Sequence, residues 1–79
     1  MEPTHDNIAG EYAEYVQLIT EHQGAMLGYI TSLIPLVDGK SDVLQESNMV
    51  LWNKRDEFVI GTYFKGWSFK IAYLQTIAH

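Results

Sequence analysis

Cysteine is absent from this chain of 79 residues. Without thiols, neither a disulfide framework nor a thiolate zinc site can hold the fold together, and a reducing cytoplasm is the simplest location. A chain this short forms one domain. Its core is only marginally sufficient unless the helices pack closely or a partner covers part of the surface.

Long hydrophobic runs are also absent. No stretch approaches the roughly 18 uninterrupted apolar residues of a membrane span, and the opening MEPTHDNIAG lacks the basic and then apolar order of a signal peptide. The sequence therefore predicts a soluble chain that does not engage a membrane. Residues 1–7 are expected to be disordered.

Catalytic and metal-binding motifs are missing as well. The three histidines (His5, His22 and His79) are scattered and have no HxxxH spacing, which disfavours a metal site. His22 lies at the edge of an apolar band, where a partly buried, hydrogen-bonded histidine is expected. Nucleophile-elbow, Walker A and dinucleotide-binding motifs do not occur. We therefore expect a binding module without a cofactor, and not an enzyme.

Basic residues are few and unevenly distributed. The net charge of −5 argues against nucleic acid, because phosphate binding requires clustered Lys and Arg. Residues 1–53 carry eight acids and one lysine, a net charge of −7, whereas residues 54–79 have a net charge of +2. This asymmetry is typical of two surfaces with different partners. On charge alone, an ordinary acidic surface is the simpler explanation.

Apolar residues recur at helical spacing in the first half of the chain. At about 100° per residue they form one band, which predicts a single long helix over about 8–36. Gly24 and Gly28 lie on the opposite side, where they can let the helix bend. Pro35 and the turn residues that follow end it. The band consists of Tyr12, Tyr15, Val16, Ile19, Met26, Leu27, Ile30, Leu33 and Ile34.

Two further helices are expected over about 41–55 and 63–78, separated by a break at Gly61. Together the three patterns predict an all-α fold, a compact antiparallel bundle of three main helices. Phe69 and Tyr73 face nearly opposite to the core stripe of the last helix. The expected core stripes are Val43, Leu44, Ser47, Val50 and Leu51 in the second helix, with Ser41 as its N-cap, and Phe64, Trp67, Ile71, Leu74 and Ala78 in the third.

The second predicted helix carries an unusual surface strip. Its members follow the spacing i, i+3, i+4, i+7, i+10, opposite the core stripe. They are Asp42, Gln45, Glu46, Met49 and Trp52. A tryptophan inside a short polar strip is typical of an interface anchor, worth about 2 kcal/mol or more. Burial of Trp52 against the first helix explains the same spacing equally well.

The segments DVLQESNMVLW, NKRDEF and GTYFKGWSFKIAY resemble region 2 of the extracytoplasmic-function (ECF) sigma factors, members of the sigma-70 family of bacterial RNA polymerase specificity subunits. The resemblance covers about residues 9–79. It implies a sigma region 2 domain over 8–79 that binds core polymerase in the cytoplasm and recognises and melts the promoter −10 element. The family's region 4 is missing, so the chain is expected to be truncated. Such domains are commonly masked by an anti-sigma factor.

The resemblance also implies site residues by position. Docking on the clamp helices of the polymerase beta-prime subunit is assigned to Asp42, Gln45, Glu46, Asn48, Met49 and Trp52. Contact with −10 DNA, including a flipped base at the loop, is assigned to Phe58, Thr62, Tyr63, Lys65, Trp67, Lys70 and Tyr73. Trp67 also lies on the core stripe, which favours a structural role. Many family members carry Arg-Asn where this chain has Tyr73-Leu74.

Two other interpretations fit the sequence. One is a small helical protein-interaction module, for instance a dimerising adaptor, that shares the pattern without binding DNA. The other is an acidic regulator that mimics DNA or masks a basic protein, which the negative charge of residues 1–53 favours.

Overall fold

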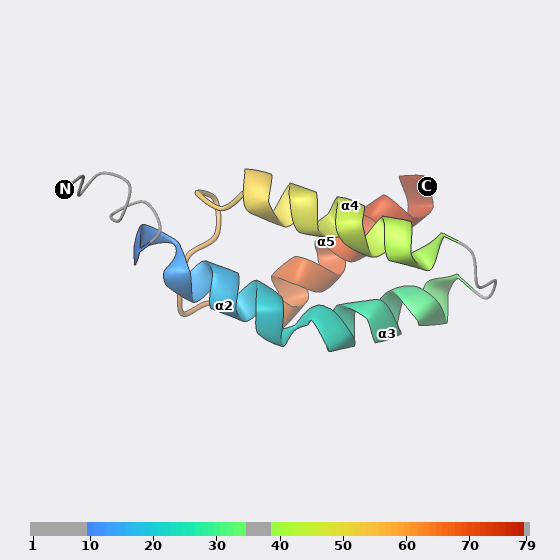
Figure 1. The fold of residues 1–79 in the computed structure, drawn as a ribbon, viewed down its shortest axis with the longest axis horizontal. Helices are drawn as coiled ribbons and strands as arrows, with labels where there is room; N and C mark the ends of the chain where they lie inside the picture. Colours follow the sequence, from blue (N-terminus) through green and yellow to red (C-terminus); the bar gives the residue numbers. More distant parts are fainter. Residues whose placement is uncertain (1–9, 35–38, 79) are drawn as a thin grey trace.

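Four helices lie within residues 10–34 and 39–78, the ranges that the computed structural model describes. They are α2 (Ala13–Glu21), α3 (Gln23–Leu33), α4 (Lys40–Asn53) and α5 (Phe64–Ala78). Figure 1 shows α2 and α3 end to end along one side, α4 returning beside them, and α5 crossing obliquely against α3 and α4. The predicted all-α class is confirmed. Residues 1–7, where disorder is predicted, lie outside the described ranges.

The first predicted helix is interrupted at His22, so the prediction of one continuous helix is wrong. His22 has φ −100° and ψ 5° and lies between α2 and α3. Backbone hydrogen bonds still cross the break, since the His22 N–H donates to the Leu18 carbonyl at 3.1 Å and the His22 carbonyl accepts from Met26 at 2.8 Å. The break lies two residues before Gly24, where glycine weakens the helix. The result is a bend between two helices that remain almost collinear in Figure 1.

The ends of the other helices agree with the sequence to within three residues. α3 ends at Leu33 and Ile34 is extended, as expected for a residue that precedes proline. α4 begins one residue earlier than predicted, because Gly39 and not Ser41 is its N-cap. Gly39 has φ 96°, a left-handed conformation that glycine adopts without a steric penalty.

The core lies where α3, α4 and α5 meet. The predicted stripe of α4 is confirmed, since Val43, Ser47 and Leu51 are fully buried. Ser47 satisfies its hydroxyl on its own helix by donating to the Val43 carbonyl at 2.7 Å. The buried apolar residues are Tyr15, Met26, Ile30, Val43, Leu51, Phe64, Ile71 and Ala72.

Two predicted core positions of α5 are wrong. Leu74 is 45% exposed and Ala78 is exposed, whereas Ser68 and Ala72 are fully buried. The side of α5 that faces the other helices therefore combines the bulky Phe64 and Ile71 with the small Ser68 and Ala72, which let helices approach closely. One predicted core position of α2 is also wrong, because Val16 is 45% exposed.

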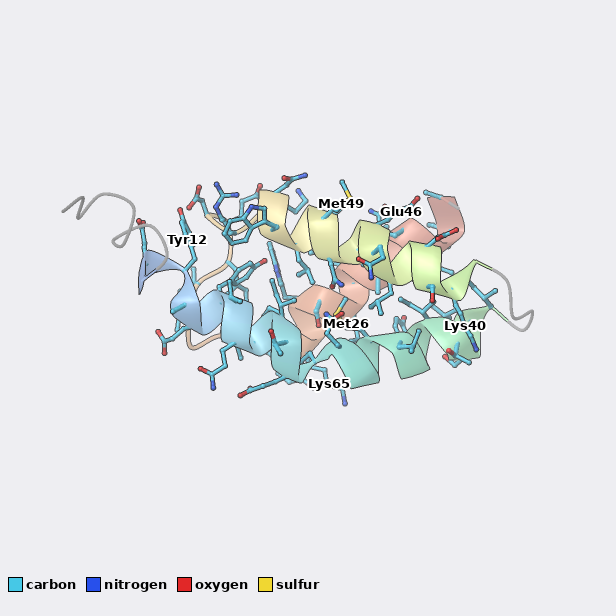
Figure 2. All side chains as sticks on the ribbon, viewed as in Figure 1. Tyr12, Met26, Lys40, Glu46, Met49 and Lys65 are labelled. Carbon is cyan, nitrogen blue, oxygen red and sulfur yellow. The ribbon has the colours of Figure 1, made fainter. Side chains whose placement is uncertain are left out.

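A pair of methionine substitutions tests the core. Met26 is fully buried and Met49 is 65% exposed; Figure 2 shows Met26 between the helices and Met49 pointing away from them. Met26→Ala should lower the free energy of unfolding by about 2–5 kcal/mol because it leaves a cavity. Met49→Ala should change it by less than about 0.5 kcal/mol. Urea unfolding followed by circular dichroism measures both, and equal midpoints would contradict this core.

Candidate functional site

The five strip residues of the second predicted helix lie on the outer face of α4, and we call them the α4 strip. All five are exposed. Met49 is 65% exposed and Trp52 is 40% exposed, so the strip has apolar surface open to a partner. Its polar members are Asp42, Gln45 and Glu46. The structure thus brings together a continuous surface of two acids, one amide and two large apolar side chains.

Trp52 is neither free nor buried. Its ring meets the edge of the Tyr12 ring, with centroids 5.7 Å apart and planes at 73°. The Arg55 guanidinium lies over both rings, 4.3 Å from the Trp52 centroid and 5.1 Å from the Tyr12 centroid. The two interpretations of Trp52, an exposed interface anchor and a residue buried against the first helix, therefore each hold in part. Tyr12, the residue before α2, covers one side of the Trp52 ring and leaves another side exposed.

Asn48, the sixth residue assigned to docking, faces α3 and is not part of the exposed strip. Its amide and that of Gln23 pair reciprocally: each Nε2 or Nδ2 group donates to the other side-chain oxygen at 2.8 Å. Gln23 also donates to the Ile19 carbonyl at 3.1 Å. The pair is partly buried and ties α3 to α4. Sequence reasoning missed Gln23. The one local sign that its amide faces another helix is its place next to His22 and three residues before the buried Met26.

His22 has the environment that the sequence predicts. It is partly buried, its Nδ1 lies 2.8 Å from the Leu18 carbonyl oxygen, and its ring meets the Phe64 ring with centroids 4.9 Å apart. The prediction of a packed, hydrogen-bonded histidine is confirmed.

Five of the seven residues assigned to DNA surround one groove of about 420 Å³, which we call the loop groove. The preceding loop turns at Gly61, whose φ of 100° favours glycine. Thr62 closes this turn, with its hydroxyl donating to the Val59 carbonyl at 2.6 Å. The groove is lined by Glu57, Phe58, Val59, Thr62, Tyr63, Gly66, Trp67 and Lys70.

The inner wall of the loop groove belongs to the aromatic core. Phe58 packs against the Trp67 and Phe64 rings, with centroids 5.5 and 5.3 Å away. The Trp67 indole N–H donates to the Tyr15 hydroxyl at 3.2 Å, and that hydroxyl donates to the Leu51 carbonyl at 2.6 Å. Burial raises the pKa of the Tyr15 hydroxyl, so it stays protonated. Trp67 therefore combines the predicted structural role with a place at the groove.

Tyr63 forms the outer part of the groove. It is 72% exposed, and its ring packs over Gly66: a Cβ added to Gly66 would lie 2.9 Å from the Tyr63 Cδ2 atom. Any larger residue at position 66 would have to displace the ring. Gly66 therefore supports the Tyr63 ring from one side, while most of the ring stays exposed to solvent.

Lys65 and Tyr73 lie outside the loop groove. The Lys65 ammonium is 5.5 Å from the Phe69 ring centroid, and Phe69 stacks on Tyr29 of α3 with centroids 4.5 Å apart. Lys65 therefore lies toward α3, as Figure 2 also shows, while Lys70 lines the groove. Tyr73 is 44% exposed, about one turn beyond Lys70.

Comparisons with models of protein families, with curated proteins and with solved structures give no match for this chain. None of the helices described is long and apolar enough to cross a membrane. Among the described side chains, His, Asp and Glu do not gather in threes that could hold a metal ion. Function is therefore inferred from the sequence resemblance together with the α4 strip and the loop groove.

Two asparagines of α4 test the role of the amide pair. Asn48→Ala should lower the free energy of unfolding by about 1–3 kcal/mol, because Gln23 is left partly buried without its partner. In a domain of this size that corresponds to a thermal midpoint lower by about 4 °C or more. Asn53 is exposed, and Asn53→Ala should leave the midpoint nearly unchanged. Equal midpoints would show that the pair contributes nothing.

Proposed function

We propose that this chain is a region 2 domain of an ECF sigma factor that binds core RNA polymerase and helps to recognise and melt the promoter −10 element in the cytoplasm. One observation carries the proposal. The sequence resemblance assigns six residues to polymerase and seven to DNA, and the two sets lie on different surfaces. Five of the six form the α4 strip on the exposed face of α4, and five of the seven line the loop groove.

The α4 strip has the chemistry of a helix-docking surface. Trp52 supplies an amphipathic anchor of the kind enriched in binding hot spots, and Met49 supplies an adaptable apolar contact. Asp42 is exposed in the first turn of α4 and favours a partner with basic residues. These features suit the clamp helices of the beta-prime subunit. An anti-sigma factor that covers the same strip is a further implied partner.

The loop groove has the chemistry of a site for unpaired bases. Single-stranded nucleic acid is held by aromatic rings on which bases stack and by cations that meet phosphates. Tyr63 offers an exposed ring, Phe58 and Trp67 form an apolar wall, and Lys70 supplies the cation at the rim. Stacking of about 1–3 kcal/mol per base offsets part of the cost of flipping a base. The chain itself carries out no covalent step, which belongs to the polymerase.

A second candidate function is supported by the far half of α5. Tyr73, Leu74 and Ile77 are 44%, 45% and 64% exposed, and Tyr73-Leu74 replace the Arg-Asn of many family members. An apolar face suits a protein partner better than DNA. A helical protein-interaction module that does not bind DNA is therefore the alternative.

A pulldown with the isolated beta-prime clamp coiled coil tests the docking surface. The chain should be retained, and a variant with both Gln45→Ala and Trp52→Ala should not be, because it loses the anchor and a register-setting amide. Ile77→Ala is the matched control, since it removes an exposed apolar group that lies outside the α4 strip. If the folded double variant binds as well as the natural chain, docking through the α4 strip is wrong.

Binding of a single-stranded −10 oligonucleotide in the polymerase-bound state tests the loop groove. Lys70→Gln should weaken it and reduce the dependence of log K on log salt by about 0.7, because one phosphate contact is lost. Lys65→Gln, on the α3 side of α5, should have the smaller effect. Tyr63→Ala should also weaken binding, by about 1–3 kcal/mol. Unchanged affinity in the Lys70 and Tyr63 variants would contradict this site and favour the module without DNA binding.

A further inference from the structure

Trp52 belongs to a cluster built from two distant parts of the chain. Tyr12 lies just before α2, Trp52 lies in the last turn of α4, and Arg55 and Asp56 follow the end of α4. We call these four residues the Trp52 cluster. The two ends of the cluster are 44 residues apart in sequence, between Tyr12 and Asp56. The orientation of Trp52 therefore depends on where α2 begins, and not on α4 alone.

Two side-chain hydrogen bonds stabilise the Trp52 cluster, one made by Tyr12 and one made by Arg55. The Tyr12 hydroxyl donates to the Asp56 carboxylate, and this bond raises the pKa of Tyr12, so the hydroxyl keeps its proton at neutral pH. Arg55 turns back over its own helix end, where its Nη1 donates to the Trp52 carbonyl at 2.9 Å and its backbone N–H to the same oxygen at 3.1 Å. A cation at a helix C-terminus is also favoured by the helix dipole.

The Arg55 guanidinium is the centre of the cluster. It lies over the Trp52 ring at 4.3 Å and the Tyr12 ring at 5.1 Å. Its Nε is buried and has no hydrogen-bond partner in residues 10–34 and 39–78. Contacts with the two rings therefore add to the Nη1 hydrogen bond in holding the guanidinium in place. Trp52 is thus enclosed by a ring edge and a cation, while 40% of its surface remains exposed.

We propose that Tyr12 and Arg55 are positioning residues for the α4 strip, which hold the Trp52 ring in one orientation before a partner helix arrives. The inference rests on the proposed docking function of the α4 strip. A side chain that is already ordered loses less entropy on binding than one that moves freely. Tyr12 and Arg55 therefore raise the affinity through Trp52.

The first measurement concerns Trp52 alone and needs no partner. In the full chain labelled with ¹⁵N, the indole N–H resonance of Trp52 is identified by its loss in Trp52→Phe. Its heteronuclear NOE reports motion on the picosecond to nanosecond timescale. Tyr12→Ala and Arg55→Ala should lower this NOE, and Tyr12→Phe, which keeps the ring edge, should leave it close to that of the natural chain. An unchanged NOE in the two alanine variants overturns the proposal.

The second measurement is titration against the clamp coiled coil. Tyr12→Ala should weaken binding by about threefold to tenfold, and Tyr12→Phe by much less. In the Trp52→Ala background, Tyr12→Ala should have no further effect, because a positioning residue acts only through the ring that it holds. Equal losses in both backgrounds would mean that Tyr12 contacts the partner directly, which overturns the positioning role.

The two proposals fail in different ways. If the NOE falls in Tyr12→Ala but affinity does not, while Trp52→Ala still weakens binding, positioning is wrong and docking stands. If Trp52→Ala binds as tightly as the natural chain, the docking role of Trp52 is wrong, and positioning for docking is overturned with it. The NMR spectra also show whether each variant is folded, and Arg55→Ala tests the cluster independently of α2.

Discussion

The Tyr15 hydroxyl joins three helices through one buried oxygen. It donates to the Leu51 carbonyl near the end of α4 and accepts from the Trp67 indole of α5. Leu51 lies in the last turn of its helix, where carbonyls lack intrahelical partners, so the hydroxyl satisfies a group that would otherwise be costly to bury. The α4 strip ends beside this junction and the loop groove begins at it. The relative placement of the two surfaces therefore depends on Tyr15 and on the rings of Phe58 and Phe64 packed against it.

The small size of the chain explains why so much apolar surface remains outside. Within residues 10–34 and 39–78 the core has eight buried apolar residues. The fold leaves Met49, Val59, Tyr63 and Ile77 more than 60% exposed. Exposed apolar groups that gather on one face are typical of binding surfaces. The two proposed surfaces also differ in charge, because the α4 strip carries two acids and no base, whereas the loop groove is lined by one acid, Glu57, and one lysine, Lys70.

Periodicity alone predicted the helical class and the core stripe of α4, because each depends on bulky or charged residues at regular spacing. It left open whether Trp52 is exposed or buried. It failed where small or polar residues decide the packing. Ser68 and Ala72, not Leu74, face the core, and the amide of Asn48 is held by Gln23. A hydrophobic pattern cannot show a reciprocal amide pair between two helices. It also cannot show that the first predicted helix is interrupted at His22. The cluster around Trp52 depends on Tyr12, which a helical wheel of α4 does not contain. Assignment of the two partners came from the family resemblance and stays a prediction.

The central claim is that one small domain offers the α4 strip to polymerase and the loop groove to DNA. Hydroxyl-radical footprinting tests it most directly, because it reads the solvent accessibility of individual side chains and Met, Trp and Tyr react readily. Core polymerase alone should protect Met49 and Trp52, and addition of a single-stranded −10 oligonucleotide should then protect Tyr63, with Ile77 unprotected throughout. Protection of Ile77 and Tyr73, with Met49 and Trp52 still reactive, would contradict the account.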